Sequence, residues 1–225
     1  MVRFERLDVL RRKIRQDDVE ELGKPTWALI REAIRAGRSE EALELLEYGC
    51  EGDKANNDSL TAFVSCTLTN LASFGEELLE KMMRERYTPT IVDWLARTPG
   101  PLESLYRIAE IQRYHYGEIA ITEEPDRYVV RMDPCGTGGR VWRTQNVGTT
   151  KKAYPWTWNR TGIPYYCVHC SLMWEIIPIE LRGYPIRISV LGEKPESPCV
   201  SYLYKRPELI PEEYFLTVGK TKTIK

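Results

Sequence analysis

The stretch GEIAITEEPDRYVVRMDPC, residues 117–135, decides how this chain divides. Apolar and polar residues alternate on both sides of Glu123-Glu124-Pro125-Asp126, and this pattern predicts two strands joined as a hairpin. Further along, residues 184–191, YPIRISVL, and residues 200–204, VSYLY, have the β-branched and aromatic content typical of strands. We therefore expect the β structure to follow Gly117.

The residues before Gly117 predict helices. Pro25 and Gly37 stand at the two ends of one apolar-rich stretch in the order that helix termini favour, and Ser39 can cap the next stretch. A last helix is expected over residues 102–116, with Pro89 and residues 98–101 separating the preceding ones. In a third helix, apolar positions recur with a 3.6-residue period at Leu60, Phe63, Val64, Thr67, Leu68 and Leu71.

These patterns together predict an α+β chain. A helical N-terminal half, residues 1–116, would pack against a C-terminal mixed or antiparallel β region, residues 117–218, that carries a thiolate-rich metal site. Residues 219–225, GKTKTIK, would form a flexible tail. The helical region is also where we would place contacts of a homo-oligomer.

Composition narrows the class of protein. Of the 225 residues, 42% are hydrophobic and 29% are charged, as in ordinary globular proteins. No apolar run approaches the about 20 residues of a membrane span, and the N-terminus lacks the apolar stretch of a signal peptide, so we expect a cytoplasmic protein without membrane contact. Lys and Arg number 32 against 33 Asp and Glu, with no dense basic stripe, which argues against a nucleic-acid partner. Basic residues exceed acidic ones by four in residues 121–225, which would favour a small anionic substrate.

Cysteines carry the main chemical signal. In a reducing compartment, six cysteines indicate buried thiols, metal ligands or catalytic groups rather than disulfides. Cys50 and Cys66 fall in expected helices, and we interpret them as buried packing residues. Cys167 and Cys170 form a Cys-x-x-Cys pair, whose two thiolates can bind one soft or borderline divalent cation. Cys135 lies in a glycine-rich turn that leaves room around its side chain, and it is the expected third ligand.

The fourth ligand position decides between functions. Cys199, His169, His115 or a water molecule can fill it. With Cys199, four thiolates would form a structural or sensing zinc site, whereas three protein ligands and water would form a catalytic one. Our first hypothesis is a zinc-dependent hydrolase or lyase that acts on a small, anionic or thiol-bearing substrate. His169 or His115 would act as ligand or as acid and base, and Asp133 as general base unless it only shapes the turn.

Aromatic residues precede the cysteine pair at high density. Trp156, Trp158, Arg160 and Tyr166 are our candidates for the wall of a substrate pocket, although such aromatic residues can also cover a thin sheet core.

Two other chemistries fit the same cysteines. The sequence Cys167-Val168-His169-Cys170 resembles the active dithiol of the strongly oxidising thioredoxin-fold proteins, which implies exchange through a Cys167–Cys170 disulfide. The resemblance covers these four residues, and a Trp- and Pro-rich loop precedes them instead of a strand and helix. An iron–sulfur cluster is a further alternative to zinc.

Overall fold

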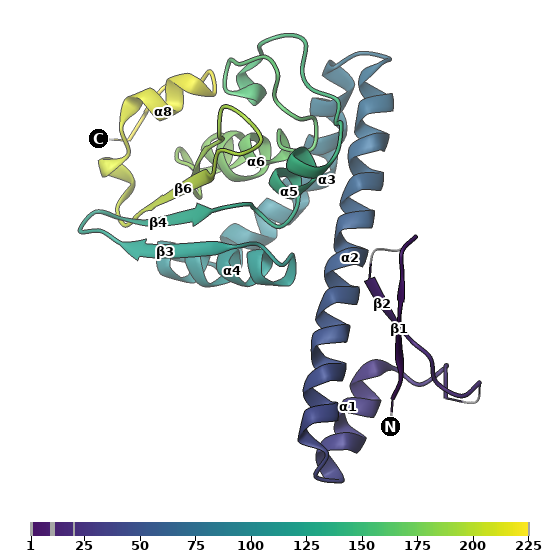
Figure 1. Cartoon of the computed structure of the whole chain (residues 1–225). Coiled ribbons are helices and arrows are strands. Elements are labelled where there is room, and N and C mark those ends of the chain that lie inside the picture. The colour runs from purple at the N-terminus through teal and green to yellow at the C-terminus, as the bar shows by residue number, and fades with distance from the viewer. Residues whose placement is uncertain (1, 10–11, 20, 225) are drawn as a thin grey trace. The chain divides into compact units, whose positions relative to one another are not determined.

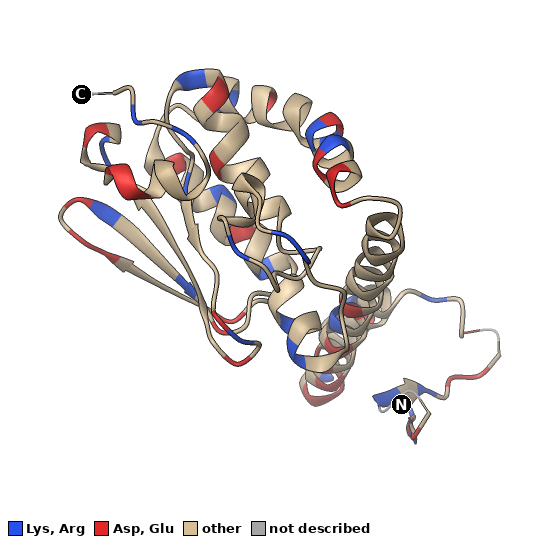
Figure 2. Ribbon diagram, turned by 90° about the horizontal axis from the view of Figure 1, so that it is seen from above, with Lys and Arg blue, Asp and Glu red and all other residues tan. Residues whose placement is uncertain are grey.

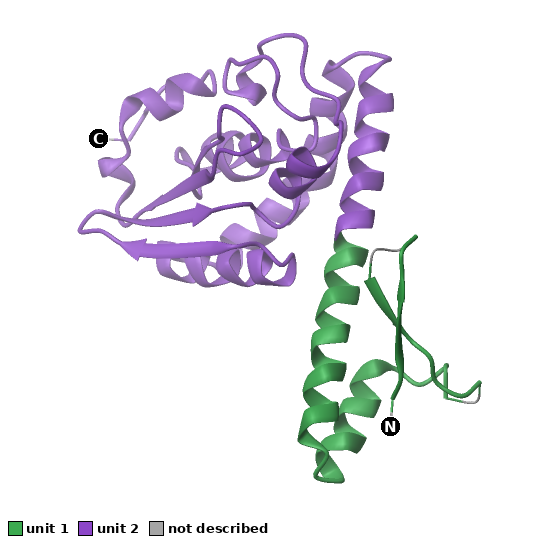
Figure 3. Ribbon diagram, viewed as in Figure 1, with its two compact units in different colours: residues 1–57 green, residues 58–225 purple. Residues whose placement is uncertain are grey.

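The structure is a computed structural model that describes residues 2–9, 12–19 and 21–224. The chain divides into two units, residues 1–57 and residues 58–225 (Figure 3). The division falls within the helix α2, Ser39–Ala72, whereas the change of sequence pattern suggested residue 116. Helices that we expected in a separate N-terminal half therefore belong to the same unit as the sheet.

Unit 1 combines a short antiparallel ladder with helices. Strand β1, Phe4–Leu7, pairs with β2, Arg12–Arg15, and helix α1, Thr26–Arg35, follows after Pro25. The helix α1 was predicted, but a helical first half was wrong for β1 and β2. Their sequences, FERL and RKIR, are short and rich in charged residues, so their alternation is a weak signal.

Three long helices open unit 2. After the second part of α2 come α3, Glu77–Arg97, and α4, Pro101–Tyr114, the latter close to its predicted bounds. We expected Pro89 to separate two helices, and this was wrong, since Pro89 lies inside α3. A proline removes one backbone hydrogen bond, but Met83, Ile91 and Trp94 are buried on both sides of it and hold the helix in place.

The sheet of unit 2 is antiparallel and confirms the α+β class. It comprises β3, Ile119–Glu123, β4, Arg127–Met132, β5, Ile188–Val190, and β6, Cys199–Tyr204, in the order β3-β4-β6-β5 (Figure 1). The predicted hairpin is β3 with β4. Shorter elements complete the unit: α5, Gly138–Thr144; η1, Pro155–Thr157; α6, His169–Ser171; the π-helical turn η2, Leu172–Ile176; α7, Ile177–Arg182; η3, Pro207–Leu209; and α8, Glu212–Thr217.

The core of unit 2 lies between this sheet and the helices. The turn η2 contacts α3 and β5, and α4 contacts β3 and β6. Trp94 on α3 meets Trp174 on η2 edge to face, with ring centroids 5.0 Å apart. Leu203 on β6 belongs to the same buried cluster. The segment that carries the cysteine pair is thus fixed by contacts on both of its sides.

The third predicted helix exists, but only part of its predicted apolar face is buried. Leu60, Phe63 and Val64 on α2 are exposed, while Thr61, Ser65 and Leu68 are buried. The 3.6-residue period predicts where the apolar residues of a helix lie. Which side of the helix is buried depends on the elements that pack against it. Assembly of copies through this region remains a prediction.

The last residues are not extended away from unit 2. Lys220 Nζ lies 2.6 Å from Glu180 Oε1, and Ile224 packs against the larger core cluster. Lys225 lies outside the described residues, so the expected flexible tail is described for residues 219–224 only.

Charges are mixed over the surface of unit 2. Acidic and basic positions lie next to one another along its helices (Figure 2), and Arg84 pairs with both Glu80 and Glu180. Within the described part of the chain, no helix combines the length and the apolar character that crossing a bilayer requires.

Leu203→Ala tests the importance of the central strand. Leu203 has no exposed surface, so we expect the free energy of unfolding to fall by about 2–5 kcal/mol, as in other buried leucine truncations. Urea denaturation followed by circular dichroism measures it. Leu181→Ala is the matched control, because Leu181 is 47% exposed and should change stability by less than about 0.5 kcal/mol. Equal losses in both variants would contradict the described packing.

Candidate functional site

The glycine turn after β4 allows two sulfur atoms to approach the backbone closely. A Cβ atom on Gly138 would lie 2.7 Å from Cys167 Sγ, and one on Gly139 would lie 3.0 Å from Cys135 Sγ. The Gly139 N–H also donates to Cys135 Sγ over 3.0 Å. Glycine is therefore required here for close approach, as the sequence suggested for Cys135.

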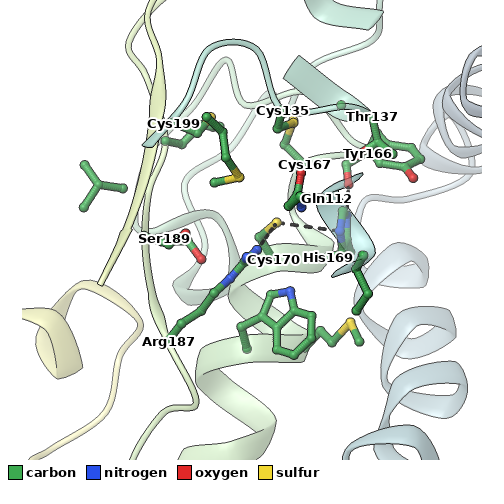
Figure 4. A pocket seen from close by; sticks show the side chains of 18 of the residues that line it. Gln112, Cys135, Thr137, Tyr166, Cys167, His169, Cys170, Arg187, Ser189 and Cys199 are labelled. Carbon is green, nitrogen blue, oxygen red and sulfur yellow. Dashed lines mark hydrogen bonds between the residues drawn. The ribbon is translucent and has the colours of Figure 1, made fainter. Parts of the chain in front are cut away.

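Four cysteines from separate segments line one cavity of about 220 Å³ (Figure 4). Cys135 follows β4, Cys167 and Cys170 flank the start of α6, and Cys199 begins β6. Both histidines of the chain, His115 and His169, line the same cavity. The fold thus brings together the residues that we expected to act at one site, although they are separated by up to 84 positions in the sequence.

Side chains that line the same cavity are not necessarily arranged to bind one metal ion. Among the residues that the structure describes, no group of three or more His, Cys, Asp or Glu side chains is arranged to hold a metal ion. The metal site with Cys135, Cys167, Cys170 and His169 therefore stays a proposal. Cys50 and Cys66 were wrongly interpreted as packing residues, since both are exposed on α2.

One cysteine has two polar partners at its sulfur. Cys170 Sγ lies 3.6 Å from His169 Nε2, and Arg187 Nη2 donates to it over 3.5 Å. His169 Nδ1 lies 2.6 Å from the carbonyl oxygen of Tyr166. Because this oxygen can only accept, we assign a proton to Nδ1, which leaves Nε2 to exchange a proton with the sulfur. A thiol, an imidazole and a carbonyl that orients the imidazole thus lie in contact in this order, an arrangement that can activate a cysteine.

Three of these thiols, Cys167, Cys170 and Cys199, differ in acidity. Burial raises the pKa of the Cys170 thiol, but His169 and Arg187 outweigh burial and lower it to about 6. The Cys170 sulfur in turn outweighs burial at His169 and raises the pKa of that imidazole. Burial raises the pKa of Cys199 to about 12 and that of Cys167 well above its ordinary range. At neutral pH, Cys170 is therefore more ionised than Cys167 and Cys199.

A buried carboxyl group lies behind the cavity wall. Glu175 Oε1 accepts hydrogen bonds from Trp158 Nε1 and from the Ser189 N–H, both at 3.1 Å, while Oε2 has no partner among the described residues. Burial raises its pKa from 4.5 to about 8. Glu175 is thus mostly protonated at neutral pH.

The remaining predicted site residues lie in different places. Trp158 and Tyr166 line the cavity, and so does His115, whose pKa is lowered by burial. Trp156 is instead a core residue that stacks on Tyr154. Arg160 and Asp133 are not among the residues that line the cavity. Arg160 donates to the carbonyl of Leu191, and Asp133 pairs with Arg131 and Arg143.

The site residues that we predicted did not include Arg187, Ser189 and Ser201. All three line the cavity, and Arg187 is 3% exposed. The sequence does contain a pattern that marks two of them. Arg187 and Ser189 are two residues apart in YPIRISVL, so their side chains point to the same side of a strand whose other residues are apolar. Polar side chains on the inward face of a buried strand indicate a site rather than a core.

Alkylation should single out Cys170. With its pKa lowered to about 6, the thiolate forms as pH rises through that value, so the rate of reaction with iodoacetamide should reach half its plateau near pH 6. Mass spectrometry of peptides after timed labelling measures each cysteine separately. His169→Gln should move the midpoint to higher pH. The exposed Cys66 serves as internal reference, and identical pH profiles for Cys66 and Cys170 would contradict the described contacts.

Glu175 should make stability depend on pH. Its pKa is higher in the folded chain than in the unfolded chain, so its contribution is full below about pH 4.5 and is lost as pH rises through about 8. We expect Glu175→Gln, which mimics the protonated form, to flatten the decline of the urea midpoint over this window. The exposed Glu193→Gln is the control and should keep the wild-type slope. A wild-type slope in Glu175→Gln would show that other groups cause the decline.

The side chains of this site indicate its chemistry. The observations that bear on it are one thiol with a histidine and an arginine at its sulfur, three further thiols, and a cavity that they share. No family model, no curated protein and no solved structure matches the chain.

Proposed function

We propose that this chain is a cysteine-dependent hydrolase with Cys170 as its nucleophile. The observation that carries the proposal is the contact of Cys170 Sγ with both His169 Nε2 and Arg187 Nη2 at the wall of a cavity. A neighbouring base and a cation favour the thiolate, which is the reactive form of cysteine. The hydrolase part of our first hypothesis is kept, with a thiolate in place of a metal-bound water.

The reaction follows from the roles of two side chains. The Cys170 thiolate attacks the acyl carbon of an ester or amide, a carbon–sulfur bond forms, and the bond to the leaving group breaks. His169 gives its Nε2 proton to that leaving group. A water molecule then attacks the thioester and gives a proton to His169, and the acid and the thiolate are released.

The cavity favours a small substrate. Its volume of about 220 Å³ lies below the about 300–1,000 Å³ that is usual for sites of drug-sized ligands. Trp158, Met173 and Trp174 contribute apolar and aromatic surface to the wall, and Tyr166 adds a further ring. An apolar wall also limits water near the thiolate, which strengthens its interaction with Arg187.

A zinc-dependent hydrolase or lyase is the second candidate. It is favoured by the presence of four cysteines and both histidines around one cavity. Cys135, Cys167 and Cys170 would bind the ion with His169 or water, or with Cys199 in a closed structural site. Small rotations of the side chains would be needed, since no such group is arranged for ligation among the described residues. Dithiol exchange between Cys167 and Cys170 is a weaker alternative, because burial raises the pKa of the Cys167 thiol well above its ordinary range and so keeps this thiol unreactive.

Acyl trapping tests the first proposal. After brief exposure of the purified protein to p-nitrophenyl acetate, we expect an acetyl adduct on Cys170, detected by peptide mass spectrometry, and release of p-nitrophenolate. Cys170→Ser should abolish the thioester adduct, and His169→Gln should slow its hydrolysis by about 100-fold or more, as for a lost acid–base catalyst. Cys66→Ser is the matched control and should react like the wild-type protein.

Metal analysis of the same preparation separates the two candidates. If the protein contains about one zinc per chain and the adduct forms only after chelation, the zinc site is favoured over the thiolate nucleophile. If the adduct forms at the same rate with and without chelator, the nucleophile is supported. Absence of any Cys170 adduct in zinc-free, folded protein would contradict the proposal.

A further inference from the structure

One face of the sheet is polar where it forms the wall of the cavity. In the antiparallel register, Ser189 on β5 lies directly opposite Ser201 on β6. Arg187 precedes Ser189 by two positions and Cys199 precedes Ser201 by two, so side-chain alternation puts all four on the same face. All four line the cavity, and Figure 4 shows Arg187 and Cys199 reaching into it from this sheet.

The two serines are buried without hydrogen-bond partners. Ser189 Oγ and Ser201 Oγ are inaccessible to solvent and bond to no other atom among the described residues, and the same holds for Arg187 Nε. Most buried polar atoms in proteins have a partner, because leaving one without costs about 1–3 kcal/mol. Three unpartnered donors beside one cavity therefore indicate that a bound molecule satisfies them.

The contacts of Arg187 indicate which kind of molecule the cavity can bind. Its guanidinium is buried and contacts the Cys170 sulfur and the face of Trp174, with 4.9 Å to the ring centroid. No carboxylate of the described residues lies within 4.0 Å of it. The nearby Glu175 directs Oε1 to Trp158 and to the Ser189 backbone. One guanidinium N–H of Arg187 is directed at the Cys170 sulfur, and its unpartnered Nε–H and the two hydroxyls remain as donors for a small acceptor.

We propose that the cavity binds the carboxylate group of a small molecule through Arg187, Ser189 and Ser201. Two carboxylate oxygens can accept from two hydroxyls and one guanidinium N–H at the same time. Cys170 also contacts Arg187, so the remainder of the molecule would extend toward its sulfur. This inference rests on the proposed function in treating the cavity as a substrate site, and it names the substrate class as small monocarboxylates that carry a hydrolysable group.

A second cavity is also lined by Arg187, but Ser189 and Ser201 do not line it. It has a volume of about 200 Å³ and is lined by Pro101, Ser104 and Arg182 among others. Arg182 already donates to the carbonyls of Tyr184 and Pro185, and Ser104 is not one of the unpartnered residues. Ser104 is nevertheless a buried serine, and it therefore provides a matched control for Ser189 and Ser201.

Binding can be tested separately from catalysis. The full chain carrying Cys170→Ser, which lacks the proposed nucleophile, is titrated with propionate, propionamide and inorganic phosphate, and binding is followed by ligand-observed NMR. We expect propionate to bind, and propionamide and phosphate to bind at least about tenfold more weakly. Adding Ser189→Ala and Ser201→Ala together should weaken propionate binding by about tenfold or more, since each removes a hydrogen bond to a charged group. Ser104→Ala should leave it unchanged.

The outcomes distinguish this inference from the proposed function. Because Arg187→Gln removes a buried charge, the conservative Arg187→Lys is measured as well, and circular dichroism reports the fold of each variant. Propionate should also slow alkylation of Cys170 in the wild-type chain. If propionate fails to bind, or binds no better than propionamide or phosphate, the inference is overturned even where the acetyl adduct forms. If propionate binds as expected and no adduct forms, the carboxylate site stands and the nucleophile fails.

Discussion

The register of three antiparallel strands determines which of their side chains line the cavity. Strand β6 lies between β4 and β5, with Ser201 opposite both Val130 and Ser189, and Cys199 opposite Met132. A shift of one residue in β6 would turn Cys199 and Ser201 away from the cavity and put their neighbours in their place. The hydrogen-bonded ladder therefore positions one thiol and one hydroxyl, and the loops that leave the sheet supply the other groups.

The cavity carries costs that a purely structural core would avoid. Arg187 is a buried charge, Glu175 is a buried carboxyl with an unpartnered oxygen, and two serines lack partners among the described residues. Each of these lowers stability unless a partner compensates it. The surrounding packing offsets the cost: Trp94 against Trp174, and Leu203 in the central strand, are apolar contacts of the same cluster. Burial without compensation is typical of sites that are completed by another molecule.

Sequence patterns predicted the elements better than their contacts. The hairpin of β3 and β4, and helix α4, follow from alternation, glycine and proline positions, which are local signals. The local pattern could not show which face of α2 is covered, nor that Pro89 is tolerated inside α3, because tertiary packing decides both. For the site, residue types and the glycine turn pointed to cysteines that line one cavity. Arg187 was missed because a lone arginine in a strand resembles a surface residue until the strand's two faces are compared.

The environments of the four thiols argue for a division of roles among them. Cys135 accepts a backbone N–H, and Cys167 is packed where Gly138 has no side chain, so backbone contacts constrain both sulfurs. Cys199 lies on the sheet, where burial keeps its pKa near 12. Cys170 has an imidazole and a cationic side chain at its sulfur. A closed four-cysteine zinc site would use all four sulfurs as ligands. The contacts of Cys170 with His169 and Arg187 support its proposed role as nucleophile, with the other three cysteines shaping the cavity around it.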